Sequence, residues 1–216
     1  TVGAELIIVD NKLNLIRRID LGYYANLAPI SPDGSSVVYN DKNDQLWIIS
    51  LDNGSKFQLT NSPDGFFNPH WSPDSRKIAA NSLSGDIVVF DIDSHQSYRI
   101  GKGTSINWLK DSNNILYCEL EWNKRFQLEK SQLIITDFTG ENRAELGVSS
   151  NSQILFCHYV PEQNRIVYVF KMNLIIHQIK RLGQRVEISD RQIISVDRFG
   201  MIDQPEAPAI RLDYST

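Results

Sequence analysis

Trp71-Ser72-Pro73-Asp74-Ser75 repeats, in its chemistry, a phrase that stands 41 positions earlier, Ile30-Ser31-Pro32-Asp33-Gly34. Weaker copies of the phrase begin at Trp108 and Tyr159. Proline presets φ for a turn and aspartate bonds to nearby backbone N–H groups, so each copy predicts a turn. A β-rich stretch follows every copy. We therefore expect repeated units in which Ile30, Trp71, Trp108 and Tyr159 hold equivalent places.

A second, apolar phrase alternates with the turn phrase and occurs five times, at residues 6–10, 46–50, 87–91, 133–137 and 174–178. The spacings between its copies are 40, 41, 46 and 41 residues. The longer spacing reflects an insertion near residues 119–130. Together the two phrases predict four short strands per unit, and no window shows the period of an amphipathic helix. The apolar phrases should be buried on both faces.

One four-stranded sheet of this size cannot bury both of its faces alone, whereas sheets packed around an axis can. The sequence therefore predicts an all-β fold, a β-propeller of four-stranded blades in a single domain over residues 1–216. The full blades are predicted at about residues 22–62, 63–101, 102–148 and 149–189.

The ends of the chain suggest how such a ring would close. Residues 1–21 supply a third and a fourth strand only, and residues 190–216 have room for the missing two. Pairing of the N-terminal and C-terminal strands would complete five blades and remove an exposed edge. Pro205 and Pro208 fit poorly into an interior ladder. The alternatives are a piece of a six- or seven-bladed propeller, or a terminal linker.

The turn phrase at residues 30–34, its continuation through Asp52-Asn53-Gly54, and the phrase at 71–75 resemble the TolB-like, WD-type β-propeller repeat. The resemblance is strongest over residues 24–100 and weaker over 101–190. It implies an interaction scaffold, or a propeller domain joined to a peptidase or lyase. The repeat implies a fold and no catalytic centre.

The composition excludes several classes of protein. The chain of 216 residues carries 22 basic and 26 acidic side chains, a net charge of −4, so it has no global attraction for nucleic acid. Its basic pairs have acidic neighbours, typical of a solvated surface. No apolar run approaches the roughly 20 residues of a membrane span. We expect a soluble protein, periplasmic or cytoplasmic; oligomeric state is left open.

No catalytic or cofactor motif stands out in the sequence. No two glycines lie four apart, so a Gly-x-Ser-x-Gly elbow is absent, and residues 101–104 lack phosphate-loop spacing. Cys118 and Cys157, the two cysteines, form no disulfide scaffold and no zinc cluster. Cys157 and His158 are adjacent in a strand and should point to opposite faces. We expect a non-enzymatic chain with no cofactor and no metal.

Four polar residues are candidates for lining a central channel. His70 and His158 immediately precede Trp71 and Tyr159, and Asn107 precedes Trp108. Asn68 lies two residues from His70, on the same face if the strand alternates regularly. In a propeller these innermost strands line the channel, where Asn68, His70, Asn107 and His158 could bind an ion or small polar ligand. The alternative is a polar channel filled with water.

The insertion contains the candidates for partner binding: Trp122, Arg125 and Phe126, set among further charges. Exposed aromatic and arginine side chains are typical of protein contact surfaces, and insertions in repeat proteins often lie on the binding face. The alternative is an extended hairpin with its aromatic rings packed on the next blade.

Three functions remain open from the sequence. The leading one is a module that presents a rigid face to a protein or peptide. The second is the propeller domain of a larger hydrolase or lyase whose catalytic residues lie outside this chain. The third is a small-ligand or carbohydrate site at the channel mouth. Fold alone does not choose among them.

Overall fold

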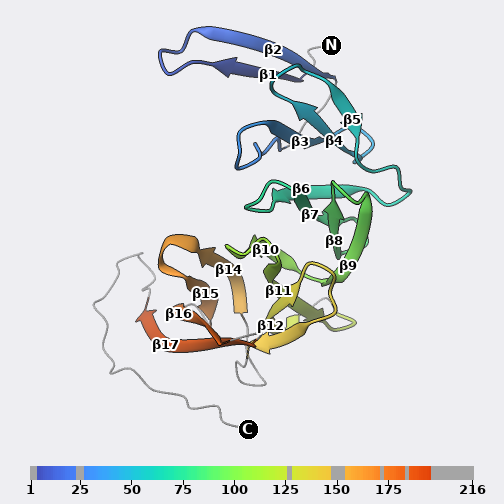
Figure 1. The fold of residues 1–216 in the computed structure, drawn as a ribbon. Coiled ribbons are helices and arrows are strands. Elements are labelled where there is room, and N and C mark those ends of the chain that lie inside the picture. The colour runs from blue at the N-terminus through green and yellow to red at the C-terminus, as the bar shows by residue number, and fades with distance from the viewer. Residues whose placement is uncertain are drawn as a thin grey trace. The chain divides into compact units, whose positions relative to one another are not determined.

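The structure is a computed structural model that describes residues 4–22, 27–125, 128–146, 154–170, 173–182 and 185–195. These ranges hold β-strands and one short 3-10 helix, Pro161–Gln163, and contain no α-helix. Every recorded strand pairing is antiparallel. The all-β prediction is therefore confirmed, and Figure 1 labels all of these strands except β13.

The strands group into five small sheets within the described ranges. The first pairs β1 (Ala4–Val9) with β2 (Leu15–Gly22), and the second joins β3 (Ser36–Asn40), β4 (Leu46–Ser50) and β5 (Lys56–Gln58). The third contains β6 (Phe66–Trp71), β7 (Lys77–Ser82), β8 (Asp86–Asp91) and β9 (Gln96–Lys102). The fourth contains β10 (Thr104–Trp108), β11 (Asn114–Trp122), β12 (Leu128–Asp137) and β13 (Arg143–Leu146), and the fifth contains β14 (Ile154–Val160), β15 (Arg165–Phe170), β16 (Asn173–Leu182) and β17 (Arg185–Ser195).

The backbone contacts divide the chain into two compact units, residues Thr1–Ser97 and Tyr98–Thr216. The boundary falls within β9. The predicted pairing of β1 with a C-terminal strand concerns residues beyond 195, which lie outside the described residues. Closure of the ring and the number of blades stay predictions.

The Ser-Pro-Asp turns fold as their sequence indicates. The Ser31 hydroxyl donates to Asp33 Oδ1 at 2.6 Å, and the Ser72 hydroxyl donates to Asp74 Oδ1 at 2.5 Å. Each aspartate oxygen also accepts a backbone N–H from two residues on, that of Ser35 or of Arg76. The two turns thus close the same network, in which the side chains satisfy backbone donors that a strand ladder leaves unpaired.

The register of the repeats confirms the predicted equivalence of the residue that begins each turn phrase. Four partners stand seven residues on: Ile30 faces Val37, Trp71 faces Ile78, Trp108 faces Ile115 and Tyr159 faces Ile166. The contact at Ile30 is an isolated bridge, so residues 22–62 show three strands in the described part rather than the four expected. Pro29 and Pro32 flank Ile30 and have no N–H to donate, which limits a ladder there.

Among the side chains that the structure describes, the apolar phrases at residues 46–50, 87–91 and 133–137 supply much of the core, and the phrase at 6–10 does not. In the first unit, Val38, Leu46, Ile48, Ile78 and Val88 pack together beside the edge-to-face pair of Phe66 and Phe90. β1 differs, because only alternate residues face the core and Ile7 is 52% exposed. The expectation that every apolar phrase is buried on both faces is wrong for β1, whose second face has no neighbour among the described residues.

The turn aspartates predict how stability depends on acid. The hydrogen bond from Ser31 lowers the pKa of Asp33 below its ordinary 3.8. Burial raises the pKa of Asp74, but the bonds from Ser72 and the Arg76 N–H outweigh it, and the net shift is downward. A carboxyl whose pKa is lower in the folded state contributes stability above its ordinary pKa, and that contribution is lost as the pH falls below about 3.8.

We therefore expect Asp74→Asn to destabilise the chain by about 1 kcal/mol at neutral pH, because it removes a carboxylate acceptor shared by several donors. The difference from wild type should be smaller at about pH 3, below the ordinary aspartate pKa of 3.8, where the contribution of the lowered pKa is being lost. Urea unfolding at the two pH values measures both quantities, with Asp52→Asn, at another exposed turn, as control. A difference that stays constant across this range would contradict the prediction.

Candidate functional site

The insertion predicted near residues 119–130 forms the far end of a long hairpin made by β11 and β12. These strands have 9 and 10 residues, whereas the corresponding β7 and β8 have 6 each. Pairing continues from Asn114↔Asp137 to Trp122↔Leu128, with a register shift after Glu121. The hairpin is therefore an antiparallel ribbon, in continuous register from Asn114 to Glu121, that is longer than its counterpart in the preceding sheet.

A polar network braces the middle of this ribbon. Arg143 Nη2 lies 2.5 Å from Glu119 Oε2, and the amide nitrogen of Gln132 donates to Glu119 at 2.8 Å and to Glu145 at 3.1 Å. Arg143 also donates to the Tyr117 hydroxyl at 3.3 Å. Because β11, β12 and β13 each contribute a charged or polar group, the network fixes the three strands relative to one another.

The electrostatics of the brace follow from partial burial. Burial raises the pKa of Glu119, but the hydrogen bonds from Arg143 and Gln132 outweigh it, so the pKa is lowered overall. Glu119 therefore stays ionised at neutral pH. Burial is also the main cause that raises the pKa of Tyr117 to about 12, so the phenol remains a neutral hydroxyl.

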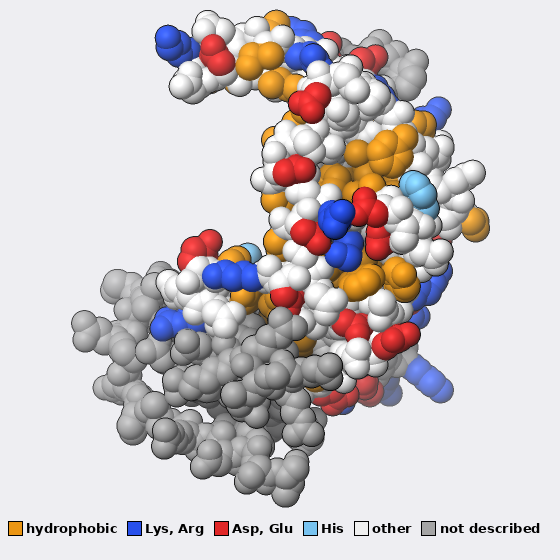
Figure 2. All heavy atoms as spheres, viewed as in Figure 1, with side chains coloured by type: hydrophobic (Ala, Val, Ile, Leu, Met, Phe, Trp, Pro, Cys, Tyr) orange, Lys and Arg blue, Asp and Glu red, His pale blue; other side chains and the backbone are white. Residues whose placement is uncertain are grey.

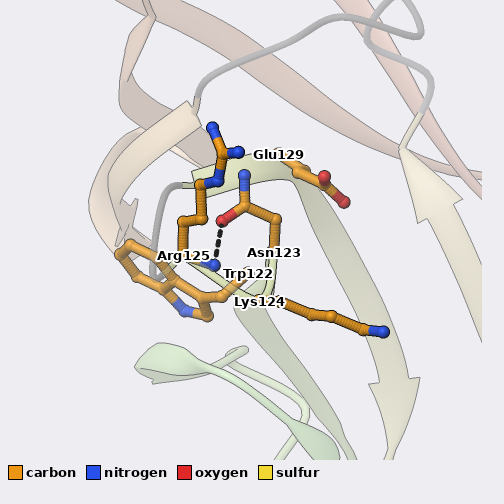
Figure 3. Close-up of a pocket in the computed structure, with 5 residues that line it drawn as sticks. All are labelled: Trp122, Asn123, Lys124, Arg125 and Glu129. Carbon is orange, nitrogen blue, oxygen red and sulfur yellow. Dashed lines mark hydrogen bonds between the residues drawn. The ribbon is translucent and has the colours of Figure 1, made fainter.

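The end of the hairpin exposes an aromatic ring among charged groups. Trp122 is 57% exposed and stands just beyond the register shift that follows Glu121. With Asn123, Lys124, Arg125 and Glu129 it lines an open hollow of about 540 Å³. Figure 3 shows these side chains diverging around the turn, with the Arg125 N–H donating to Asn123 Oδ1 at 2.8 Å.

The structure brings Trp122 and Arg125 together at this tip, while Phe126 lies outside the described residues. The alternative of aromatic rings packed on the next blade does not describe Trp122, because more than half of the residue meets solvent. We call the surface formed by Trp122, Asn123, Lys124, Arg125 and Glu129 the hairpin tip.

Of the four candidate channel residues, Asn107 forms hydrogen bonds that connect two strands. Its amide nitrogen donates to the Cys157 carbonyl at 3.1 Å and to the Ser105 carbonyl at 2.7 Å, and its oxygen accepts the Tyr159 N–H at 3.1 Å. Asn107 therefore joins β10 of one sheet to β14 of the next. Its polar groups serve the fold, and the sequence alone had not shown this role.

The two histidines occupy equivalent places in β6 and β14, and both are exposed. The protein atoms around the His70 imidazole nonetheless remove part of its hydration, which lowers its pKa and keeps it neutral near pH 7. Asn68 and His70 belong to the first unit, and Asn107 and His158 belong to the second. A channel formed by all four stays a prediction.

A β-bulge lies just before His70, Asn107 and His158 in their strands. The register shifts between Phe67 and His70, between Thr104 and Asn107, and between Leu155 and His158. The residue in the bulge has a positive φ each time, 50° at Asn68, 58° at Ser105 and 54° at Phe156. A bulge interrupts strict alternation, so the spacing of two residues does not by itself place Asn68 on the same face as His70.

Phe156 is the residue that the sequence reasoning missed. It is 73% exposed and adopts a left-handed conformation that asparagine tolerates far better than a bulky aromatic residue. The signal lay in its alignment with Asn68, three residues before the turn aromatic in each case. Recognising that signal required knowledge that the position is bulged.

Other sites considered from the sequence find a simpler explanation. Gly101 and Gly103 lie against Tyr117, where an added Cβ would overlap the ring, so packing accounts for both glycines. The Cys157 side chain is buried and His158 is exposed, consistent with opposite faces. Among the described residues, no three His, Cys, Asp or Glu side chains gather as a metal site would require.

Positive and negative side chains are mixed on the visible face, as expected for basic pairs with acidic neighbours. Figure 2 shows Lys and Arg interspersed with Asp and Glu over the described residues. Two of the ion pairs, Arg18–Glu5 and Arg76–Asp93, have exposed side chains. In the part of the chain that the structure describes, no helix is long and apolar enough to cross a membrane.

Comparison with known proteins identifies the architecture. A scan of protein-family models and a search of curated proteins each returned no match. Among solved structures, the chain is similar to the β-propeller domain of Myceliophteria thermophila Cps50 (Swd1), with a TM-score of 0.62 and 11% identity, covering 97% of this chain and 82% of that one. It is also similar to the tricorn protease, with a TM-score of 0.53 and 10% identity, covering 85% of this chain and 22% of that one. The chain has a β-propeller fold.

Proposed function

We propose that this chain is a non-enzymatic interaction module of the TolB-like type that binds a protein or peptide partner through the hairpin tip. The observation that supports this proposal is the exposure of Trp122 at the end of a hairpin longer than its counterpart. Tryptophan and arginine are among the residue types most enriched in the hot spots of protein interfaces.

The brace at Glu119, Gln132 and Arg143 supports the same function. A surface held by hydrogen bonds and an ion pair loses less conformational entropy on binding than a loop that must first become ordered. The tip also carries charges of both signs, Lys124 and Arg125 against Glu129. Such a mixture suits a partner segment with an apolar anchor flanked by charged side chains of either sign.

The proposal predicts that Trp122→Ala abolishes capture of the partner from the source organism's extract without unfolding the chain. Loss of an aromatic hot-spot side chain typically costs about 2 kcal/mol or more, which weakens affinity about 30-fold. Quantitative mass spectrometry of captured proteins, with thermal unfolding in parallel, measures both effects.

Leu13→Ala is the matched control, because Leu13 is 81% exposed in a different hairpin, between β1 and β2. Wild type and the control should retain a protein that Trp122→Ala loses. Identical sets of captured proteins for all three chains would contradict a role for the hairpin tip.

The second candidate is the propeller domain of a larger hydrolase or lyase, and the similarity to the tricorn protease favours it. This chain spans 22% of that protease chain. The gene sequence on either side of these residues provides the test. A neighbouring domain with a Ser/His/Asp or Cys/His set would support it, and the absence of such a domain from the full reading frame would rule it out.

A further inference from the structure

The fold brings together the two cysteines of the chain. Cys118 lies in β11 and Cys157 lies in β14, which belong to different sheets of the second unit. Both are free and buried, and both belong to the apolar cluster that contains Leu116, Leu133 and Ile154. Neither cysteine contributes to the hairpin tip, so the function proposed above leaves the pair unexplained.

The backbone directs both side chains toward the bulge of β10. Cys118 pairs with Thr104 in the β10–β11 ladder. The Cys157 thiol donates to the carbonyl of Ser105, the residue that follows Thr104, at 3.5 Å. The Asn107 amide also donates to the Cys157 carbonyl, at 3.1 Å. The side chains of Cys118 and Cys157 therefore adjoin within one buried cluster, where each shifts the pKa of the other.

The contact makes the two sulfurs unequal. The hydrogen bond from Cys157 lowers the pKa of Cys118, although burial opposes that shift. The same hydrogen bond, followed by burial, raises the pKa of Cys157. The thiolate is the reactive form of cysteine, so either sulfur can attack an oxidant once local opening exposes the pair, and the other then resolves the mixed disulfide.

We propose that Cys118 and Cys157 form a disulfide between adjacent sheets when the chain meets a small-molecule disulfide as oxidant. The thiolate of one cysteine attacks one sulfur of the oxidant and releases its other half as a thiol. The second cysteine then attacks the protein sulfur of this mixed disulfide and releases the second thiol. The oxidant gains two electrons and the two protons of the cysteines, and one bond joins β11 to β14.

The burial of both thiols limits the rate of disulfide formation, whereas their closeness in the folded chain favours the disulfide at equilibrium. An oxidant reaches the thiols only when β14 separates locally from β11, so oxidation of the folded chain is slow. At equilibrium the folded chain favours the bond, because it already holds the sulfurs together. The bond then restrains the separation of the fourth sheet from the fifth.

The test is a redox equilibrium that does not depend on access. The reduced chain is unfolded and diluted into buffers of graded reduced and oxidised glutathione, either native or containing concentrated guanidinium chloride. After quenching and alkylation, mass spectrometry counts free thiols and identifies the link between tryptic peptides 111–124 and 144–165. We expect an effective thiol concentration at least about 100-fold higher in the native chain than in denaturant.

An equal or lower effective concentration in the native chain would overturn the proposal, because the fold would then be holding the sulfurs apart. Cys118→Ser and Cys157→Ser serve as controls, and each should keep its remaining thiol unmodified in the native buffers. The oxidised wild-type chain should also unfold at a higher urea concentration than the reduced chain. A lower midpoint after oxidation would equally count against a site shaped for the bond.

Discussion

Replacing Gly103 with alanine should lower the free energy of unfolding by about 3 kcal/mol, the scale of severe overpacking in a core. An added Cβ would overlap the carbonyl oxygen of Cys118 and lie 2.8 Å from Cδ2 of Tyr117. Neither neighbour can easily move, because Cys118 is paired in the β10–β11 ladder and Tyr117 is fully buried. Urea unfolding followed by circular dichroism measures the loss.

Gly85→Ala is the control that separates crowding from backbone conformation. Gly85 has a φ of +88°, and no atom lies within 4 Å of the place that an added Cβ would take, so alanine there meets strain without a clash. The expected cost is about 1 kcal/mol. A Gly103→Ala chain as stable as Gly85→Ala would show that β10 and β11 do not approach as closely as described.

The second large effect is expected for Asn107→Ala, which should lower the free energy of unfolding by about 2–3 kcal/mol. The substitution removes three hydrogen bonds and leaves the Tyr159 N–H and the Cys157 carbonyl without this partner. Unsatisfied backbone groups that are partly buried carry most of the cost. Thermal and urea unfolding provide the measurement.

His158→Ala is its matched control, because His158 is exposed on the neighbouring strand and its loss should change stability by less than about 0.5 kcal/mol. The pair of variants distinguishes a structural asparagine from a residue kept for a ligand. If Asn107→Ala is as stable as His158→Ala, the hydrogen bonds between β10 and β14 contribute little to the free energy of unfolding. The prediction that Asn107 lines a channel would then be favoured over a structural role.

The repeats allow much of this fold to be predicted because their chemistry is local. A Ser-Pro-Asp turn needs only its own five residues, so Ser31 and Ser72 build the same network wherever the phrase occurs. The seven-residue register from Trp71 to Ile78 follows from that turn. The weaker copies at Trp108 and Tyr159 keep the register because the strands on both sides are apolar.

What the sequence could not supply depends on contacts between sheets. The Cys118–Cys157 pair and the bonds of Asn107 link residues that share no local motif, and they become neighbours only when two blades stack. The bulge at Phe156 could not be predicted either, because an aromatic residue does not indicate a left-handed backbone conformation. The exposed face of β1 likewise depends on which segment, if any, lies beside it.

The hairpin tip was predictable in part. Irregular spacing located the insertion, and its composition singled out Trp122 and Arg125. The brace at Glu119, Gln132 and Arg143 was not visible, because the three residues lie on three strands whose register the sequence does not fix. Under the proposed function, that brace would hold the strands that carry Trp122 in place before a partner binds.

Photo-crosslinking at the hairpin tip tests the central claim most directly. The photoreactive amino acid p-benzoyl-phenylalanine replaces Trp122 in one chain and Leu13 in a control, and each chain is irradiated in extract of the source organism. We expect a discrete protein or peptide adduct from position 122 that is absent from position 13 and is competed away by unlabelled wild-type chain. Equal adducts from both positions, or none from position 122, would contradict binding through the hairpin tip.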